Sequence, residues 1–454
     1  MALCEDVVKR VFILGLCFSL ISCGSDNVES QGVPAVSEDT VKEEIITPAT
    51  ATVSVDIQLL FDEDIAENLL QSTPENVNFP LGLKAAFDIE YKGAFRVIAE
   101  GESNSNFAVG ALGYNPDNNS IYMAGHSHHN AIAEFAIPSD LSLEPEVINL
   151  PHAAVLQDYV TILDKKDVGR TTDRINGILY YDQNLLVSSE IWYDASAQNT
   201  DNLQVFTNAM DLASSNYKGM LKLEGAAKAA GYMSKVPAEL VDTLGTEYLV
   251  GWASNYSITS RYSQGPSLYR FNPRDAIDAE VTLDTHIATD PLMVFPLAEG
   301  TQLVEGGNEF IEDISPIWGP GSQAMYGFIV PNTHYFLAVG RSGGLHSGYG
   351  YKITQDNGNL CGGPCPYESA DVYNYYWLFD INDMLTAEEP WLVRPVSYGK
   401  WSHPYDESGA HVVIGGTFDE QRNMLYLALS GAGQVANYDR PPLIVGYQIA
   451  AKSP

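Results

Sequence analysis

From about Lys92 onward, the chain consists of short runs of aromatic and β-branched residues separated by turns rich in Gly, Pro, Asn and Asp. Runs such as 121–125 and 424–429 have the length of a single strand, and few stretches show the 3.6-residue period of an amphipathic helix. Because this alternation continues almost to the end of the chain, it limits the fold to the all-β class.

The runs form a loose repeat with five visible copies. Each copy has a strand, a turn, a second strand, a polar loop and a third strand, and the copies begin at Val109, Asn176, Tyr248, Met325 and Val412. In the fourth copy, the third strand is either 348–353 or 376–381. Four copies are followed by a candidate fourth strand, at 146–150, 220–223, 293–297 and 391–396.

The last copy lacks a fourth strand, whereas an extra strand at 94–98 precedes the first copy. If strand 94–98 completes the last sheet, the sheets close into a ring and no sheet edge is left open. The sequence therefore predicts an all-β fold, a β-propeller of five blades closed by an N-terminal strand. Inserted loops or a sixth blade are alternatives, because the copies are long for a propeller. The second fold that the pattern allows is a two-layer β-sandwich.

Several segments of this region are similar to a group of uncharacterised secreted bacterial propeller-like proteins: Tyr114-Asn-Pro116, Gly125-His126, Ala133-Glu134, Gly265-Pro-Ser267 and 377–383. The resemblance spans most of residues 90–450. It implies the propeller fold and brings no activity with it.

The N-terminus carries Lys9 and Arg10, an apolar run over 11–21, and Leu20-Ile21-Ser22-Cys23 followed by small polar residues. This pattern resembles the signal peptide and lipobox of bacterial lipoproteins. The resemblance implies cleavage before Cys23, acylation of Cys23 and anchoring to the bacterial envelope, with the outer membrane favoured because Gly24 follows the cysteine. The apolar run is too short for a membrane-spanning helix. An ordinary cleaved signal, with Cys23 incidental, is the alternative.

Composition divides the chain into four predicted parts. Residues 1–22 are the signal peptide, and residues 23–52, which contain no aromatic residue, form a flexible acidic tether. Residues 53–90 are an N-terminal extension packed on the domain, and residues 91–454 form the propeller.

Of the five cysteines, Cys4 and Cys17 would leave with the signal and Cys23 would be acylated. Cys361 and Cys365 then remain as a close pair, and an even remainder in an exported protein predicts a disulfide. A metal site there would need further ligands, and no His or carboxylate lies beside the pair.

The chain has 24 basic and 58 acidic residues, a formal net charge of -34. Such a surface repels nucleic acids and anionic lipid headgroups, so no nucleic-acid partner is expected. The predicted contact with the membrane is through the N-terminal lipid alone.

In a propeller, the loops between second and third strands gather on one face with the loops between blades, and here these loops are rich in aromatic and polar residues. We predict that this face binds a polar ligand, either a carbohydrate, a cell-surface component or an envelope protein. Exposed aromatics would stack on the ligand and arginines would bind its acidic groups. The candidate residues are Arg174, Trp192, Tyr193, Tyr256, Arg261, Tyr262, Trp318 and Arg341. Packing of the aromatics between blades is the structural alternative.

His126 and His128 have the spacing that places both imidazoles on one side of an extended segment. They would hold a divalent metal if a third ligand came from elsewhere, with His411, His403 or His346 as candidates. Hydrogen bonding within a polar hairpin loop is the alternative role.

The acidic residues on the predicted loops support a competing prediction, that the protein is an enzyme rather than a binding protein. A glycosidase-like or metal-assisted hydrolase with its site at the propeller axis would use Glu190, Asp173 and Asp406, or Asp313, as acid, base or nucleophile. A scaffold that only presents surface is the third possibility.

Overall fold

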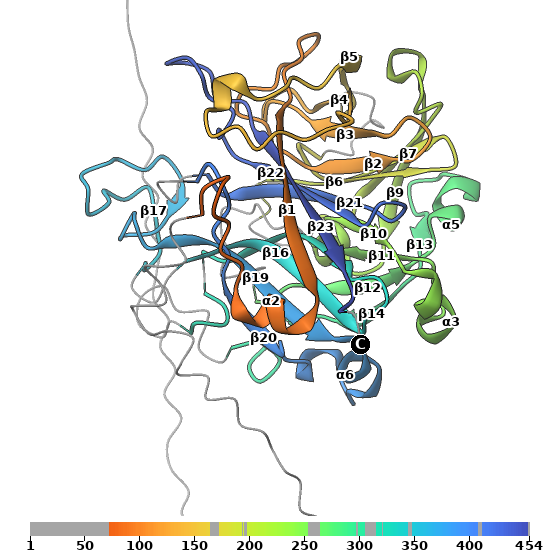
Figure 1. Cartoon of the computed structure of the whole chain (residues 1–454). Helices are drawn as coiled ribbons and strands as arrows, with labels where there is room; N and C mark the ends of the chain where they lie inside the picture. Colours follow the sequence, from red (N-terminus) through yellow and green to blue (C-terminus); the bar gives the residue numbers. More distant parts are fainter. Residues whose placement is uncertain are drawn as a thin grey trace, which may run out of the picture. The chain divides into compact units, whose positions relative to one another are not determined.

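The structure is a computed structural model that describes residues 72–163, 172–192, 194, 198–252, 264–296, 298–304, 315–319, 321–343, 347–406 and 411–452 (Figure 1). Among the described residues, its strands form five sheets, each with four antiparallel strands from an inner strand outward, and one separate two-stranded sheet. One of the five sheets carries a fifth, parallel strand. The inner strands β2, β6, β10, β15 and β21 contact one another in that cyclic order. The fold is therefore a five-bladed β-propeller, as predicted.

The first two blades follow the predicted repeat in their first three strands. Blade 1 consists of β2 (Leu112–Asn115), β3 (Ser120–Ala124), β4 (Ala131–Ala136) and β5 (Val155–Thr161). Blade 2 consists of β6 (Arg174–Tyr181), β7 (Asn184–Glu190), β8 (Leu203–Thr207), β9 (Asn216–Leu223) and the parallel addition β13 (His286–Ile287).

The remaining blades contain the longest strands and the closing strand. Blade 3 consists of β10 (Met233–Lys235), β11 (Tyr248–Gly251), β12 (Leu268–Phe271) and β14 (Thr289–Met293). Blade 4 consists of β15 (Gln323–Ile329), β16 (Tyr335–Gly343), β19 (Val372–Asp380) and β20 (Ser397–Lys400). Blade 5 consists of β21 (Val413–Asp419), β22 (Met424–Leu429), β23 (Leu443–Ala450) and β1 (Asp88–Arg96).

The ring closes as the sequence predicts. β1 pairs antiparallel with β23, with Ala94 opposite Val445 and Phe95 opposite Ile444, and the two strands lie side by side in Figure 1. The N-terminal strand thus supplies the outer strand of the last blade. β1 begins at Asp88, so residues 88–90 belong to this strand rather than to the N-terminal extension.

Three predicted strand positions are wrong and one strand was not predicted, and the strands that the structure has there are short or contain few buried apolar residues. The outer strand of blade 1 is β5 rather than 146–150, where Val147–Asn149 forms the 3-10 helix η2. In blade 3, the three-residue inner strand β10 was missed, and the outer strand β14 lies four residues before the predicted one. In blade 4, residues 390–392 form the 3-10 helix η6, which overlaps the predicted strand at 391–396, and the outer strand is β20 instead.

The third strand of blade 4 is β19, the second of the two predicted alternatives. Residues 348–353 belong instead to an insertion between β16 and β19, where β17 (Gly350–Tyr351) pairs with β18 (Pro364–Cys365). A disulfide joins Cys361 and Cys365 within this insertion, as predicted.

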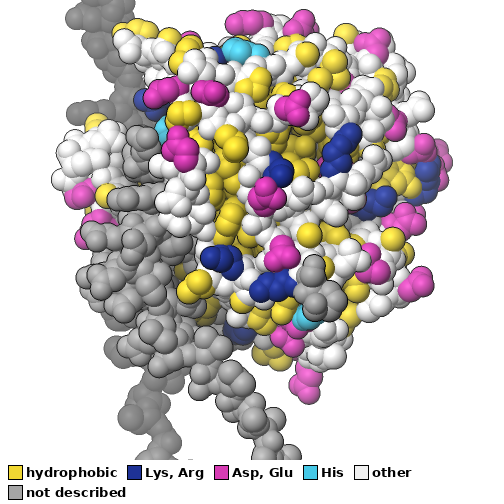
Figure 2. All heavy atoms as spheres, viewed as in Figure 1, with side chains coloured by type: hydrophobic (Ala, Val, Ile, Leu, Met, Phe, Trp, Pro, Cys, Tyr) yellow, Lys and Arg dark blue, Asp and Glu magenta, His cyan; other side chains and the backbone are white. Residues whose placement is uncertain are grey.

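The helices are short and lie in the connections. They are α2 (Leu81–Ala86), α3 (Val241–Leu244), α5 (Pro273–Asp278), α6 (Ile381–Thr386) and the 3-10 helices η3 (Leu212–Ser214), η4 (Ala226–Ala229) and η5 (Ala238–Leu240). α2 buries Leu83, and Phe87 directly after it is also buried in the core. None of the helices among the described residues is long and apolar enough to cross a membrane. Figure 2 shows acidic side chains spread over the described surface in this view, with Lys and Arg between them.

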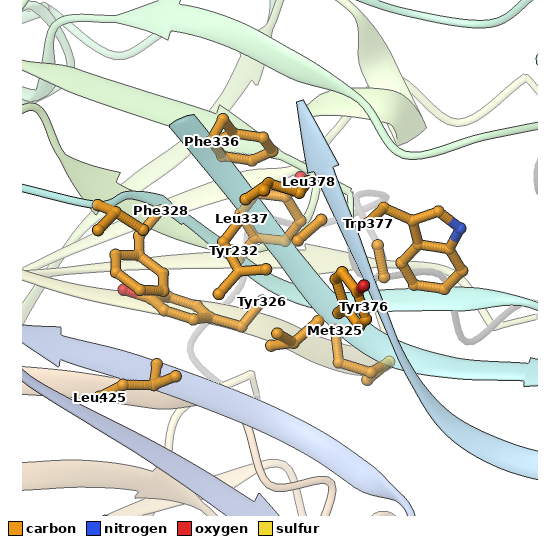
Figure 3. Close-up of a cluster of buried hydrophobic side chains, with 14 of the residues drawn as sticks. Tyr232, Met325, Tyr326, Phe328, Phe336, Leu337, Tyr376, Trp377, Leu378 and Leu425 are labelled. Carbon is orange, nitrogen blue, oxygen red and sulfur yellow. The ribbon is translucent and has the colours of Figure 1, made fainter. Parts of the chain in front are cut away.

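The blades are held together by apolar side chains between neighbouring sheets. The largest cluster surrounds blade 4, where Tyr326, Phe336 and Trp377 are buried (Figure 3). Phe328 of blade 4 stacks on Phe418 of blade 5 with 4.5 Å between ring centroids. These contacts fix the position of each blade, and with it the loops at the ends of the strands.

Candidate functional site

The start of each inner strand, the end of the second strand and the start of the third lie at one edge of an antiparallel blade. In blade 2, this edge carries Arg174 at the start of β6 and Glu190 at the end of β7, and the two residues are cross-strand partners. We call the side of the propeller formed by these edges the loop face. Trp252, which follows β11, and Arg341, near the end of β16, belong to the same face.

Glu190 is the most unusual residue of the loop face. Its side chain is 5% exposed, and the Trp252 indole N–H donates to Glu190 Oε2 at 3.3 Å across the boundary between blades 2 and 3. Its other oxygen, Oε1, is buried and accepts no hydrogen bond among the described residues. Burial raises the pKa of Glu190 to about 7, against the lowering effect of Asn176, Trp252 and Arg174.

Arg174 lies close to Glu190 but forms no ion pair with it among the described residues. Its guanidinium carbon lies 4.3 Å from the centroid of the Trp192 ring. Asp173 accepts the backbone N–H of Trp192 at 2.6 Å, which fixes the tryptophan backbone beside the arginine. Burial lowers the pKa of Arg174, while Glu190 and Asp173 act in the opposite direction.

A small pocket opens beside Glu190. It is lined by the end of β7, the loop after it and the connection to blade 3: Ser189, Glu190, Ile191, Asp194, Asn199, Asp201, Asn202, Ala227 and Ala230. The pocket wall is ordered by local hydrogen bonds, because Asp194 accepts the backbone N–H of Asn199 at 2.7 Å. The Asn202 amide donates to the carbonyl of Ala226 at 2.8 Å, which ties the two sides of the pocket together.

Lys228, in η4, is a site neighbour that the sequence analysis missed. It donates to the carbonyl of Phe295 at 2.8 Å, and its ammonium lies 5.6 Å from the centroid of the Trp252 ring. Burial lowers its pKa to about 8. Trp252 and Asn176 were also missed, and only the position of Trp252 at a strand end could have indicated a role.

Arg341 occupies the corresponding edge of blade 4. Its cross-strand partners are Gln323 and Asn374, and the side-chain Oδ1 of Asn374 accepts the backbone N–H of Val413 in blade 5 at 2.7 Å. Burial lowers the pKa of Arg341, and the guanidinium makes no ion pair with any described residue.

The three predicted carboxylates come from two parts of the chain. Glu190 and Asp173 are neighbours in blade 2, whereas Asp406 lies in the connection between blades 4 and 5. There, Asp406 accepts the Asn374 amide at 2.9 Å and the backbone N–H of His411 at 3.0 Å. Asp406 therefore holds the connection between these blades.

The predicted metal ligands His126, His128 and His411 make other contacts in the structure. His126 Nδ1 accepts the backbone N–H of His128 at 3.2 Å, and the His129 ring stacks on His126 at 4.5 Å. His411 Nδ1 is bonded to the carbonyl of Ser430 at 2.7 Å. The described residues contain no group of three His, Cys, Asp or Glu side chains arranged to hold a metal ion. Local hydrogen bonds and ring stacking use these imidazoles instead.

His403, another candidate ligand, is buried and bonded to the Tyr447 hydroxyl at 2.7 Å. Trp318 is 5% exposed and packs on Trp377 with 4.9 Å between centroids, so it belongs to the core rather than to a ligand platform. Other candidates lie outside the described residues: Cys23, Tyr193, Tyr256, Arg261, Tyr262, Asp313 and His346.

The sequence matches no protein-family model and no curated protein. Among solved structures it is similar to the PQQ-bound aldose sugar dehydrogenase of Streptomyces coelicolor, with 11% identity, a TM-score of 0.33 and coverage of 82% of this chain and 100% of that one. It is also similar to a member of the DUF4221 family from Bacteroides vulgatus, with 11% identity, a TM-score of 0.34 and coverage of 81% and 99%.

A third similar structure is Bacteroides ovatus xyloglucan PUL GH43B, with 9% identity, a TM-score of 0.33 and coverage of 79% of this chain and 54% of that one. Matches at these values of identity and TM-score say nothing about activity. The strand pairing in the structure itself establishes that this chain is an all-β propeller of five blades.

Proposed function

We propose that this protein is a lipid-anchored protein of the bacterial envelope whose propeller binds a carbohydrate on the loop face. The observation that carries the proposal is Glu190, a buried carboxylate with one unpartnered oxygen at the wall of a pocket. Burying a polar atom without a hydrogen bond costs free energy, so such an atom calls for an explanation. A ligand hydroxyl that donates to Oε1 provides one.

The surroundings of Glu190 suit a hydroxyl-rich ligand. Asn199 and Asn202 line the same pocket, and the half-buried Trp192 directly follows Ile191, another lining residue. A few polar groups that converge next to an aromatic side chain are typical of sites for polar small molecules.

The test is binding of an oligosaccharide array by the full-length protein purified in detergent, followed by titration calorimetry on the best ligand. Glu190→Gln replaces an acceptor oxygen by an amide donor, so the affinity should fall at least tenfold, about the value of one hydrogen bond to a charged group. The matched control is Glu247→Gln, an exposed glutamate directly before β11, on the opposite face. Equal losses in both variants, or no binding by the unaltered protein, would contradict the proposal.

The lipid anchor rests on the Leu20-Ile21-Ser22-Cys23 pattern and is tested separately. Cells expressing the protein are grown with an alkyne-tagged fatty acid, and label should appear on the protein and vanish in Cys23→Ala. Label that persists in Cys23→Ala would show that Cys23 is not the anchor.

A glycosidase-like hydrolase is the second candidate, favoured by the raised pKa of Glu190, about 7, which suits a general acid at neutral pH. Turnover of nitrophenyl glycosides that is lost in Glu190→Gln would replace the binding function by this one. Binding without turnover would support the first proposal.

A further inference from the structure

The blades differ in how the outer edge of their fourth strand is covered. In blade 5, the Ala94 N–H of β1 donates to the Ser142 carbonyl at 2.8 Å, and the Ser142 N–H donates back at 3.2 Å. In blade 1, the Tyr159 N–H of β5 donates to the Glu100 carbonyl at 3.0 Å, and the Tyr159 carbonyl accepts the Glu102 N–H at 2.9 Å. In blade 2, β13 pairs with β9. A further backbone segment therefore lies outside the fourth strand of these three blades.

Blade 4 differs from the other four in this respect. In blade 3, the fourth strand β14 contains Pro291, which has no N–H to offer to another strand, and α6 and η6 contact β14. The fourth strand of blade 4, β20, contains no proline, and its backbone is bonded to β19 but to no other described segment. An unpaired strand edge of this kind is a site at which another strand can pair.

The helix α2 contacts β20 on a face of the sheet rather than at this edge. Gly82 of α2 lies against the Ser397 hydroxyl, which is hydrogen-bonded to the Tyr376 hydroxyl of β19 at 2.8 Å. Because side chains project from the faces of a sheet, a helix that touches these two hydroxyls packs on a face. Directly before the two residues in contact, Leu81 is 66% exposed and Val396 is 51% exposed. The edge of β20 thus begins beside exposed apolar side chains.

We propose that residues 57–61 of this chain, Ile57-Gln58-Leu59-Leu60-Phe61, add a fifth strand to blade 4 at the edge of β20. Four of these five residues are apolar, none is Gly or Pro, and the run is as long as a short strand such as β20. The addition of β13 to blade 2 shows that a blade of this propeller accepts a fifth strand.

The position of the segment in the chain favours it over a strand from another protein. The described residues begin at Ser72, shortly after Phe61, and lead directly into α2, which contacts β20. The chain that leads back from α2 to Phe61 therefore starts beside this strand and is long enough to return to its edge. A segment tethered so close is present at a high effective concentration, which a separate molecule does not reach.

Hydrogen–deuterium exchange of the full-length protein in detergent tests the pairing. Peptides that cover 57–61 should exchange at least about tenfold more slowly than peptides from 25–50, because strand pairing protects backbone amides. Leu59→Pro removes one amide and interrupts the strand, so this protection should be lost. Ala51→Pro, placed before the segment, is the matched control and should keep it. Exchange of 57–61 in the unaltered protein as fast as that of 25–50 would overturn the proposal.

Cross-linking identifies the strand with which the segment pairs. In the double variant Leu59→Cys and Val396→Cys, a short bismaleimide should join the two cysteines within one chain, as read by mass spectrometry of the digest. The control replaces Val396→Cys by Leu156→Cys, an exposed position on β5 of blade 1, and should give at least about tenfold less product.

Each other outcome of the cross-linking counts against the proposal. Equal yields with Val396→Cys and Leu156→Cys, or no product with Val396→Cys although 57–61 is protected, would mean that the segment lies elsewhere. Products that join two chains only would show that a second copy covers the edge of β20. The melting temperature of Leu59→Pro is measured first, because unfolding would also speed exchange, and the cross-linking does not depend on that variant.

Discussion

Two buried glutamates of this propeller have opposite surroundings. Glu134, on β4 of blade 1, is 1% exposed, and its Oε1 accepts the amides of Asn115 at 2.9 Å and Asn118 at 3.1 Å. Ser120 and Gln157 donate to the same carboxylate. Glu190 is buried to a similar extent but has one donor at 3.3 Å and one oxygen without any.

The difference separates a structural carboxylate from a candidate site. The Glu134 partners come from the turn between β2 and β3 and from β5, at the edge opposite the loop face, and they fill its hydrogen-bonding capacity. A carboxylate with its hydrogen bonds made stabilises the fold, whereas a carboxylate left open lowers stability unless something else binds it.

The largest effect is expected from Glu134→Ala. The substitution removes an acceptor from the buried Asn115 and Ser120 side chains and from the partly buried Gln157 amide, so the free energy of unfolding should fall by about 3–5 kcal/mol. Urea unfolding followed by far-UV circular dichroism measures it. A loss below about 1 kcal/mol would be no larger than that of a surface substitution, and would mean that the hydrogen bonds of Glu134 do not stabilise the fold as argued.

At high pH, Glu190→Gln should raise the free energy of unfolding, whereas Glu134→Ala lowers it. The folded carboxyl keeps its proton to about pH 7, whereas its ordinary pKa is 4.5, so the folded state binds more protons between these values. The free energy of unfolding therefore falls as pH rises from about 4.5 to about 7, by roughly 2–3 kcal/mol from this one group.

The measurement for Glu190→Gln is urea unfolding at pH 5 and at pH 8. The variant should be more stable than the unaltered protein at pH 8 and similar to it at pH 5. Burial also raises the pKa of Glu420 to about 7, so only the difference between the two proteins reports on Glu190. A difference that does not change with pH would mean that Glu190 is charged throughout this range.

The smallest effect is expected from two glycines of the inner strands, Gly177 of β6 and Gly415 of β21. A Cβ on Gly177 would lie 2.0 Å from the carbonyl oxygen of Gly231, and a Cβ on Gly415 would lie 2.0 Å from that of Gly110. Each Gly→Ala substitution forces backbone apart and should cost about 1–3 kcal/mol in unfolding free energy.

Only one of the two glycines, Gly177, contacts a residue next to the pocket beside Glu190. Gly231 directly follows Ala230, which lines the pocket, so Gly177→Ala should also weaken ligand binding, whereas Gly415→Ala in blade 5 should not. Calorimetry on both variants measures this. Equal affinity in the two variants would place the binding site away from Glu190.

Strands that are dense in buried apolar residues could be located from the sequence, whereas strands with few such residues could not. β22 and β23 are dense in buried apolar residues and were predicted within one or two residues. β5 has one buried residue of seven, and β10 has only three residues in all, so neither carries a pattern that stands out from a loop. Pairing with a neighbouring strand, rather than local composition, defines these two.

For the site, sequence position alone indicated Arg174 and Glu190, because both stand at strand ends on the predicted loop face. It did not indicate Trp252 and Lys228, which come close to Glu190 only through the packing of blade 3 on blade 2. The contacts of His126 and His411 could not be predicted either, because spacing along the chain does not show which hydrogen bonds a side chain already makes.

The sequence by itself determined the all-β class, the number of blades, the closing strand and the disulfide, because strand length, turn residues and cysteine spacing are local properties of the chain. Tertiary structure alone decided which charged groups find partners. A hydrogen bond depends on distances of a few tenths of an ångström between residues far apart in sequence, and only the stacking of blades sets those distances.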